Sequence, residues 1–148
     1  MVKIPVEEKL AIAELTYAYA FCVDHKRIDG PDGVVALFTE DGVVDEIKSG
    51  QTRAVGAAQL SQFYNNSLGQ LSSTAHFVTN HVITEYTGDT AKGRAYIFGE
   101  ARVKSGGDAR VFSYYSDEYV KIDGRWRFKL RDVVPLIPSD LGSMKNLT

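Results

Sequence analysis

The C-terminal half of the sequence constrains the fold most, because it contains four long runs that alternate apolar and polar residues as β-strands do. The runs cover residues 76–86, 91–103, 110–122 and 125–134. Short connections rich in glycine join them, and Asp123-Gly124 is a strong signal for a tight β-hairpin. Strands of ten or more residues twist and curve. The sequence therefore predicts a strongly curved, mainly antiparallel sheet.

The N-terminal half predicts three helices and one short strand. Residues 5–26 form a long amphipathic helix, and residues 34–38 form a short helix closed by a turn at 39–42. A strand at 43–47 follows, then a hairpin at 48–50 and a third helix at 53–68. The inward stripe of the long helix is expected to contain residues three and four apart, namely Leu10, Ala13, Tyr17, Phe21 and Asp24.

Helices followed by an antiparallel meander indicate an α+β fold. A curved sheet wrapped on a long helix forms a cone with a ligand cavity at its wide end. The 148 residues suffice for one domain, residues 1–148. Pro135 and Pro138 end the last strand, and residues 139–148 are expected to be irregular. Met144 and the segment 136–141 could act as a lid over the cavity mouth.

Composition excludes several classes of partner. The formal net charge is only −2, from 17 basic and 19 acidic residues, and neither a basic cluster nor a long apolar run is present. We therefore expect no nucleic-acid partner and no membrane partner. A single cysteine, Cys22, excludes an internal disulfide and a cysteine metal cluster. The first ten residues lack the apolar region of a signal peptide, so we expect a cytoplasmic protein.

Two residues stand out as a candidate general base. The run SSTAHFVTNHVI alternates so that His76, Val78 and Asn80 share one strand face, while His81 lies on the other. A carboxylate that aligns a histidine fixes its tautomer and stabilises the imidazolium. Asp24 ends the long helix and could supply that carboxylate. A structural histidine with a polar neighbour is the competing interpretation.

The sequence resembles the SnoaL-like branch of the NTF2-like superfamily, most closely the scytalone dehydratase, lindane dehydrochlorinase and bile-acid 7α-dehydratase group. Three segments carry the resemblance: YAYAFCVDHKR, STAHFVTNHVI and DGRWRFKLRDV. It implies a cone-shaped α+β barrel, no cofactor, and a dimer or trimer. It also implies that Asp24 and His76 are catalytic, that Arg131 assists, and that Tyr19 occupies the polar position five residues before the aspartate.

The remaining pocket residues are open to alternatives. A regular helix places Tyr19 and Asp24 well apart around its axis, so Tyr17 is the alternative tyrosine. Asn80 could bind substrate or make a structural hydrogen bond. Aromatic residues are expected to form the walls, but a single bulge would exchange the two faces of a strand. The substrate-binding candidates are Asn80, Tyr17, Tyr96, Phe98, Phe112 and Tyr114, with Tyr115 and Tyr119 on the opposite face of their strand.

These features favour a cofactor-free lyase that eliminates water from an apolar, aromatic or polycyclic small molecule, with His76 as base. An isomerase would use the same base. A non-catalytic ligand-binding or assembly module is the alternative from another class, because fold alone does not assign function. A hydrolase would need an extra carboxylate, for which Asp45 and Glu46 are the sources. No metal site is expected, although a site at His25, His76 and Asp24 is conceivable.

Overall fold

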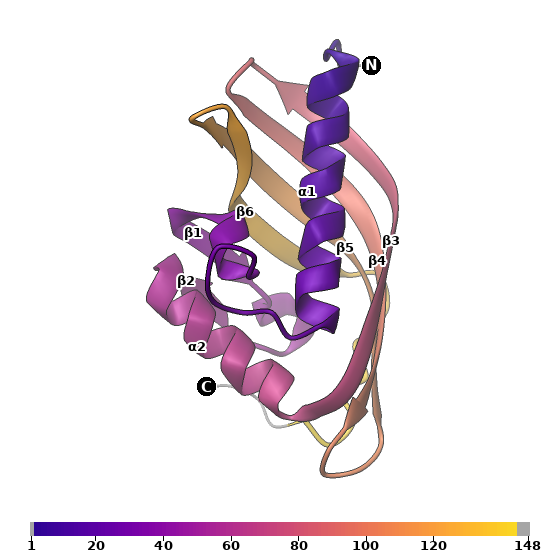
Figure 1. The fold of residues 1–148 in the computed structure, drawn as a ribbon. Coiled ribbons are helices and arrows are strands. Elements are labelled where there is room, and N and C mark those ends of the chain that lie inside the picture. Colours follow the sequence, from indigo (N-terminus) through magenta and orange to yellow (C-terminus); the bar gives the residue numbers. More distant parts are fainter. Residues whose placement is uncertain (1, 145–148) are drawn as a thin grey trace.

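Six strands form one open, mixed sheet in the computed structural model, which describes residues 2–144 (Figure 1). The strand order is β2-β1-β6-β5-β4-β3, and only the β1/β6 pair is parallel. Because the order begins at β2 and ends at β3, the sheet does not close into the predicted barrel. The strands are β1 (Phe38–Asp45), β2 (Arg53–Val55), β3 (Leu71–Tyr86), β4 (Thr90–Val103), β5 (Asp108–Ile122) and β6 (Arg125–Pro135).

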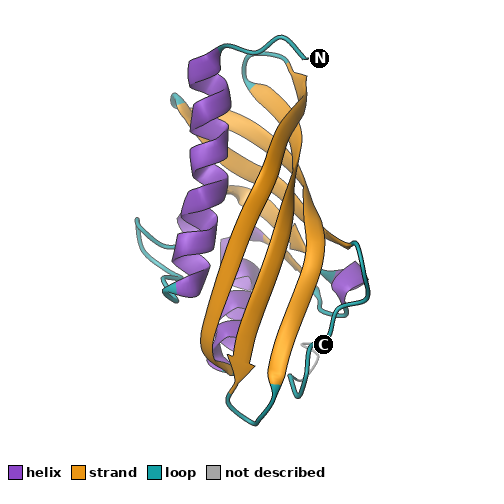
Figure 2. Ribbon diagram, turned by 90° about the vertical axis from the view of Figure 1, so that its right-hand side faces the viewer, coloured by secondary structure: helices purple, strands orange, loops and turns teal. Residues whose placement is uncertain are grey.

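Two α-helices cover the concave side of this sheet (Figure 2). Helix α1 (Val6–Asp24) packs against β3 and β6, and α2 (Gly56–Gly69) packs against β1 and β3. The α+β class and both of these helices are confirmed. The predicted helix at 34–38 is wrong, because only a 3-10 turn, Val35–Leu37, forms there. The hairpin after β1 is confirmed, with a second 3-10 turn, Ile47–Ser49, at its bend.

The predicted turn at 39–42 is part of β1 instead. Phe38 pairs with Phe128 of β6, and the register shifts before Val43. Gly42 lies at this shift, and a Cβ atom there would come within 2.8 Å of the Phe38 Cβ atom. Glycine and acidic residues that suggest a turn therefore form a bulge, because pairing with β6 outweighs their local preference.

Helix α1 buries a different stripe from the predicted one. Its buried residues include Ile12, Leu15, Tyr19 and Val23, whereas Phe21 is 61% exposed. Leu10 and Tyr17 are also exposed, so the predicted inward stripe is wrong, with the exception of Asp24 at its end. Apolar residues lie all round α1, and periodicity alone does not select one face of such a helix.

A bulge in β3 changes the assignment of its second histidine. The β3/β4 register shifts between Thr79 and Val82, and Asn80 adopts a left-handed conformation with φ 54°. The extra residue turns His81 to the inner side of the sheet, where its Nε2 atom lies 3.2 Å from the Tyr119 hydroxyl. His81 therefore does not lie on the outer face that simple alternation predicts.

The two faces of the meander differ in burial and composition. Buried residues of β5 on the inner face are Ser113, Tyr115, Asp117 and Tyr119. The outer face has a row of stacked or tilted aromatic rings, formed by Phe77, Phe98 and Phe112. The predicted homo-oligomer stays a prediction. In residues 2–144, none of the helices has the length and apolar character needed to cross a membrane.

Candidate active site

Asp24 and His76 form a hydrogen-bonded pair where the end of α1 meets β3. The Asp24 Oδ1 atom lies 2.6 Å from His76 Nδ1, and Oδ2 accepts the His76 backbone N–H at 2.9 Å. Two bonds to one residue fix the carboxylate, and the carboxylate fixes the ring. A proton on Nδ1 leaves Nε2 free to accept one. Gly99 of β4 faces the ring, and a Cβ atom there would lie 3.5 Å from Nε2.

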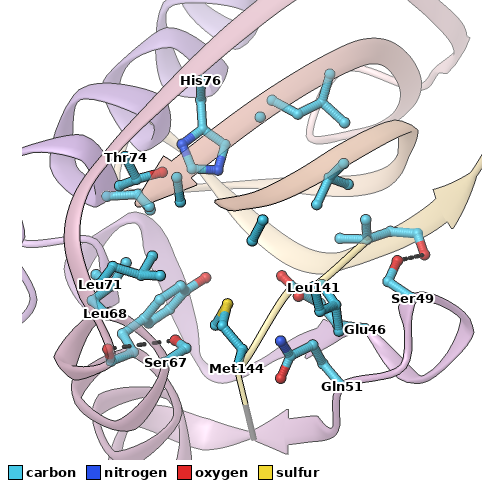
Figure 3. Close-up of a pocket in the computed structure, with 18 of the residues that line it drawn as sticks. Glu46, Ser49, Gln51, Ser67, Leu68, Leu71, Thr74, His76, Leu141 and Met144 are labelled. Atoms are coloured by element: carbon cyan, nitrogen blue, oxygen red, sulfur yellow. Dashed lines mark hydrogen bonds between the residues drawn. The ribbon is translucent and has the colours of Figure 1, made fainter. Parts of the chain in front are cut away.

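His76 borders a cavity of about 110 Å³ between the two helices and the concave sheet (Figure 3). Most of its walls are apolar, with Phe63 and Leu68 from α2 and Ile97 from β4. Leu141 and Met144 reach the cavity from the C-terminal segment. The predicted lid residue Met144 thus lines the cavity. A histidine aligned by a carboxylate beside an apolar cavity has the geometry of a general base.

Two tyrosine hydroxyls meet at the cavity wall. Tyr64 of α2 donates a hydrogen bond to the Tyr19 hydroxyl at 3.1 Å, and both residues line the cavity. Burial raises the pKa of both hydroxyls well above the usual value, so both stay protonated near neutral pH. Among the described residues, the Tyr19 hydroxyl proton has no acceptor. It can therefore be donated to an oxygen atom of a bound molecule.

Arg131 lies behind the cavity wall. Its side chain is 0% exposed and makes a two-point ion pair with Asp117, its cross-strand neighbour, at 3.0 Å and 2.7 Å. The guanidinium carbon lies 3.7 Å from the ring centre of Tyr115 and 4.2 Å from that of Tyr19. Burial alone would lower the pKa of Arg131, but the Asp117 carboxylate outweighs it and raises that pKa, so the pair is charged.

Glu46 places a second carboxyl group in the cavity. It follows β1 directly and lies across the cavity from His76 (Figure 3). In the part of the chain that the structure describes, its side chain has neither a hydrogen bond nor an ion pair. Burial raises the pKa of Glu46 to about 7, although the charges of His76 and Arg131 oppose that shift. Glu46 is therefore partly protonated at neutral pH.

A model of the SnoaL-like domain matches residues 5–132 of the chain. The chain belongs to the SnoaL-like domain family. A search of functionally curated proteins finds no match. The sequence resemblance to the SnoaL-like branch of the NTF2-like superfamily is thereby confirmed.

Solved structures share the SnoaL-like fold over nearly the whole chain. A Novosphingobium aromaticivorans protein, provisionally named an aromatic ring hydroxylase, is 35% identical, with TM-score 0.88 and coverage of 95% of this chain and 96% of its own. A provisionally named scytalone dehydratase from the same organism is 24% identical (TM-score 0.81, coverage 95% and 93%). The dehydrochlorinase LinA-type3 from Novosphingobium barchaimii is 15% identical (TM-score 0.78, coverage 97% and 95%).

The SnoaL-like domain brings together three of the four residues predicted to be catalytic: Asp24, His76 and Tyr19. His76 and Tyr19 line the cavity, and Asp24 holds His76. Arg131 does not line it, because its ion pair with Asp117 keeps it behind Tyr19 and Tyr115.

None of the predicted substrate-binding residues lines this cavity. Tyr17 lies on the exposed side of α1, and Asn80 is exposed at the β3 bulge. The aromatic candidates of β4 and β5 lie on the opposite strand face from the buried residues, which include Ala95 and Ile97 of β4 and Ser113 and Tyr115 of β5. These four residues are Tyr96, Phe98, Phe112 and Tyr114.

Several cavity residues were not predicted from the sequence. They come from the segment after β1 and from α2: Ser49, Gln51, Ser67, Leu68. Leu141 belongs to the predicted lid segment, and the sequence suggests Glu46 only as an extra carboxylate for a hydrolase. For Glu46 a signal existed, because Val44 is a core residue two positions earlier and alternate residues of a strand share a face. Among residues 2–144, no group of three or more histidine, cysteine, aspartate or glutamate side chains is arranged to hold a metal ion.

The buried Glu46 carboxyl makes stability depend on pH. Its pKa rises from 4.5 to about 7 on folding, so the folded state binds the proton more tightly. The free energy of unfolding should therefore fall between pH 4.5 and 7 and level off above pH 7. We expect Glu46 to account for about 1 to 3 kcal/mol of this fall, given about 1.4 kcal/mol per pKa unit and partial solvation by cavity water. Urea unfolding of wild type and Glu46→Gln at pH 5 and pH 8 measures this contribution. A difference in free energy of unfolding between the two proteins that is the same at both pH values would contradict it.

Proposed function

We propose that the protein is a cofactor-free lyase that eliminates water from an apolar ring compound, with His76 as general base. One observation supports this most: the Asp24–His76 pair has its unbonded ring nitrogen beside an apolar cavity. A structural histidine would be sealed in the packed core instead. Membership of a family whose solved relatives include proteins named as a dehydratase and a dehydrochlorinase agrees with elimination chemistry.

In the proposed reaction, His76 Nε2 takes a proton from a carbon atom next to an activating carbonyl group. Asp24 holds the ring through Nδ1 and stabilises the imidazolium that forms. Negative charge develops on the carbonyl oxygen, and the Tyr19 hydroxyl donates to that oxygen. The carbon–oxygen bond at the neighbouring position then breaks, and the hydroxyl group leaves as water.

The size of the cavity limits the substrate class. An apolar cavity of about 150 Å³ binds a benzene molecule. A cavity of about 110 Å³ therefore favours a single ring over a polycyclic molecule. The 35% identical relative is provisionally named an aromatic ring hydroxylase, and that name supports a cyclic or aromatic substrate for this chain.

The proposal is tested with β-hydroxycyclohexanone, a single ring that gains a conjugated enone absorbance when it loses water. Wild-type protein should produce the enone, and His76→Ala should not, while circular dichroism shows the same fold for both. Turnover by His76→Ala at the wild-type rate would refute the role of His76 as base.

Replacing Met144 with alanine should widen the range of substrates. Met144 narrows the cavity at the C-terminal segment, so its loss makes room for a second ring. We expect the ratio of kcat/KM for β-hydroxyindanone to that for β-hydroxycyclohexanone to rise about tenfold or more, since one or two buried methylene-sized contacts change such ratios by 10–200-fold. Val6→Ala, on the exposed side of α1, is the control and should leave the ratio unchanged.

A further inference from the structure

The side chain of Glu46 makes no stabilising interaction that would explain why a carboxyl group lies in the cavity. Three backbone hydrogen bonds hold the residue: its N–H donates to Thr52, and its carbonyl accepts from Ser49 and Gln51, each at 3.0 Å. The carboxyl group itself bonds to no described residue. No lysine or arginine side chain of residues 2–144 lines the cavity, so no cation there neutralises it. Glu46 is half-buried, and its carboxyl group faces the cavity. A carboxyl group removed from bulk water without a partner is unfavourable for folding, and such groups often mark functional sites.

We propose that Glu46 is the proton donor to the departing hydroxyl group, acting across the cavity from His76. This inference rests on the proposed elimination and adds a second catalytic residue to it. Hydroxide is a poor leaving group, so elimination from an alcohol needs an acid, and Glu46 presents a carboxyl group to the cavity from the side opposite His76.

The protons balance over the cycle. His76 Nε2 takes the carbon-bound proton, and the electron pair of that C–H bond forms the new double bond. The carbon–oxygen bond breaks with its electron pair on oxygen, which takes the Glu46 proton and leaves as water. His76 is then an imidazolium and Glu46 a carboxylate. A proton moves from the former to the latter through solvent in the open site, which restores both groups.

The surroundings of Glu46 favour its protonated form at rest. Tyrosine hydroxyls from three elements face it, and these groups are neutral near pH 7. The titratable and charged groups that act on it are Asp45 beside it, His76 across the cavity, and Arg131 behind the wall. Arg131 is already paired with Asp117, so its charge is largely offset. The tyrosines are Tyr19 of α1, Tyr64 of α2 and Tyr115 of β5.

A pair of probes that differ only in the leaving group separates the two proton transfers. β-Hydroxycyclohexanone and β-chlorocyclohexanone lose the same carbon-bound proton and give the same enone, but chloride leaves without a proton. Glu46→Gln should lower kcat/KM for the hydroxy compound about 100-fold, in the range for general acid catalysis, and change it for the chloro compound less than about threefold. His76→Ala should lower both. Equal losses for both probes in Glu46→Gln, or no loss for the hydroxy compound, would overturn the inference.

The controls separate this inference from the proposed function. Glu100 is the other carboxyl residue at the cavity, but it pairs with Arg102 and Arg110, so Glu100→Gln should affect neither probe selectively. Wild-type rates in His76→Ala would refute the role of His76 as base. A second measurement then tests Glu46 as proton donor independently. That measurement is a ¹³C NMR titration of Glu46, assigned by comparison with Glu46→Gln. Titration near pH 7 supports the donor, and titration below pH 5 excludes it, because the group would then be ionised.

Discussion

Replacing Arg131 with methionine is expected to lower the free energy of unfolding by about 3 to 5 kcal/mol, which is typical when one partner of a buried ion pair is removed. Arg131 and Asp117 are each no more than 2% exposed, and two hydrogen bonds join them. The substitution leaves the Asp117 carboxylate buried, and within residues 2–144 its one remaining donor is the Tyr119 hydroxyl at 2.9 Å. Urea unfolding at pH 7 measures the loss.

A double variant provides the control. In Asp117→Leu/Arg131→Met, two apolar side chains replace the pair at neighbouring positions of β5 and β6, and most of the lost stability should return. Because Arg131 does not reach the cavity, the double variant should also keep its elimination activity within about tenfold of wild type, a modest change compared with the loss of a catalytic group. A single variant that loses less than about 1 kcal/mol, the value of an exposed pair, would contradict the buried-pair account.

Replacing His76 with alanine is expected to lower kcat for elimination by about 10² to 10⁴, the usual contribution of a general base. The change removes the only imidazole that lines the cavity among residues 2–144. Its effect on folding should be small, because the side chain is 21% exposed and its loss leaves Asp24 with the backbone N–H. Steady-state kinetics beside thermal unfolding separates the two effects.

Asp24→Asn tests the alignment of the ring. The amide oxygen can still accept the His76 backbone N–H, but the amide does not hold the Nδ1 proton as a carboxylate does. We expect a loss of kcat of about tenfold or more with the fold retained, since the base loses its orienting group. Asp24→Asn with wild-type kcat would show that the pair is structural.

The sequence predicts the meander well because its signals are local. Hairpin turns such as Asp123-Gly124 have both residues at positive φ, and alternation marks each long strand. The Asp24–His76 pair is predictable for a related reason: the residue types required for a general base are few, and both residues lie in segments that resemble the family. Asp24 ends α1, and His76 lies within β3, which begins at Leu71, earlier than the predicted start at residue 76.

The walls of the cavity are not predictable in the same way, because they depend on which face of each element is buried. Helix α1 has apolar residues on all sides, so Tyr17 and Tyr19 cannot be ranked without tertiary contacts. Bulges at Gly42 and Asn80 shift the faces of β1 and β3. The role of Arg131 depends on Asp117, fourteen residues away and opposite it only in the folded sheet.

The fate of the carbon-bound hydrogen tests the central claim most directly. Proton NMR of β-hydroxycyclohexanone in deuterated water follows the hydrogens next to the carbonyl group. If His76 is the base, wild-type protein removes that signal, by exchange or by elimination, well above the rate in buffer, and His76→Ala leaves it at the buffer rate. Equal loss with His76→Ala would contradict the claim. So would a wild-type product that keeps all of these hydrogens, because removal of one of them is the first step of the proposed reaction.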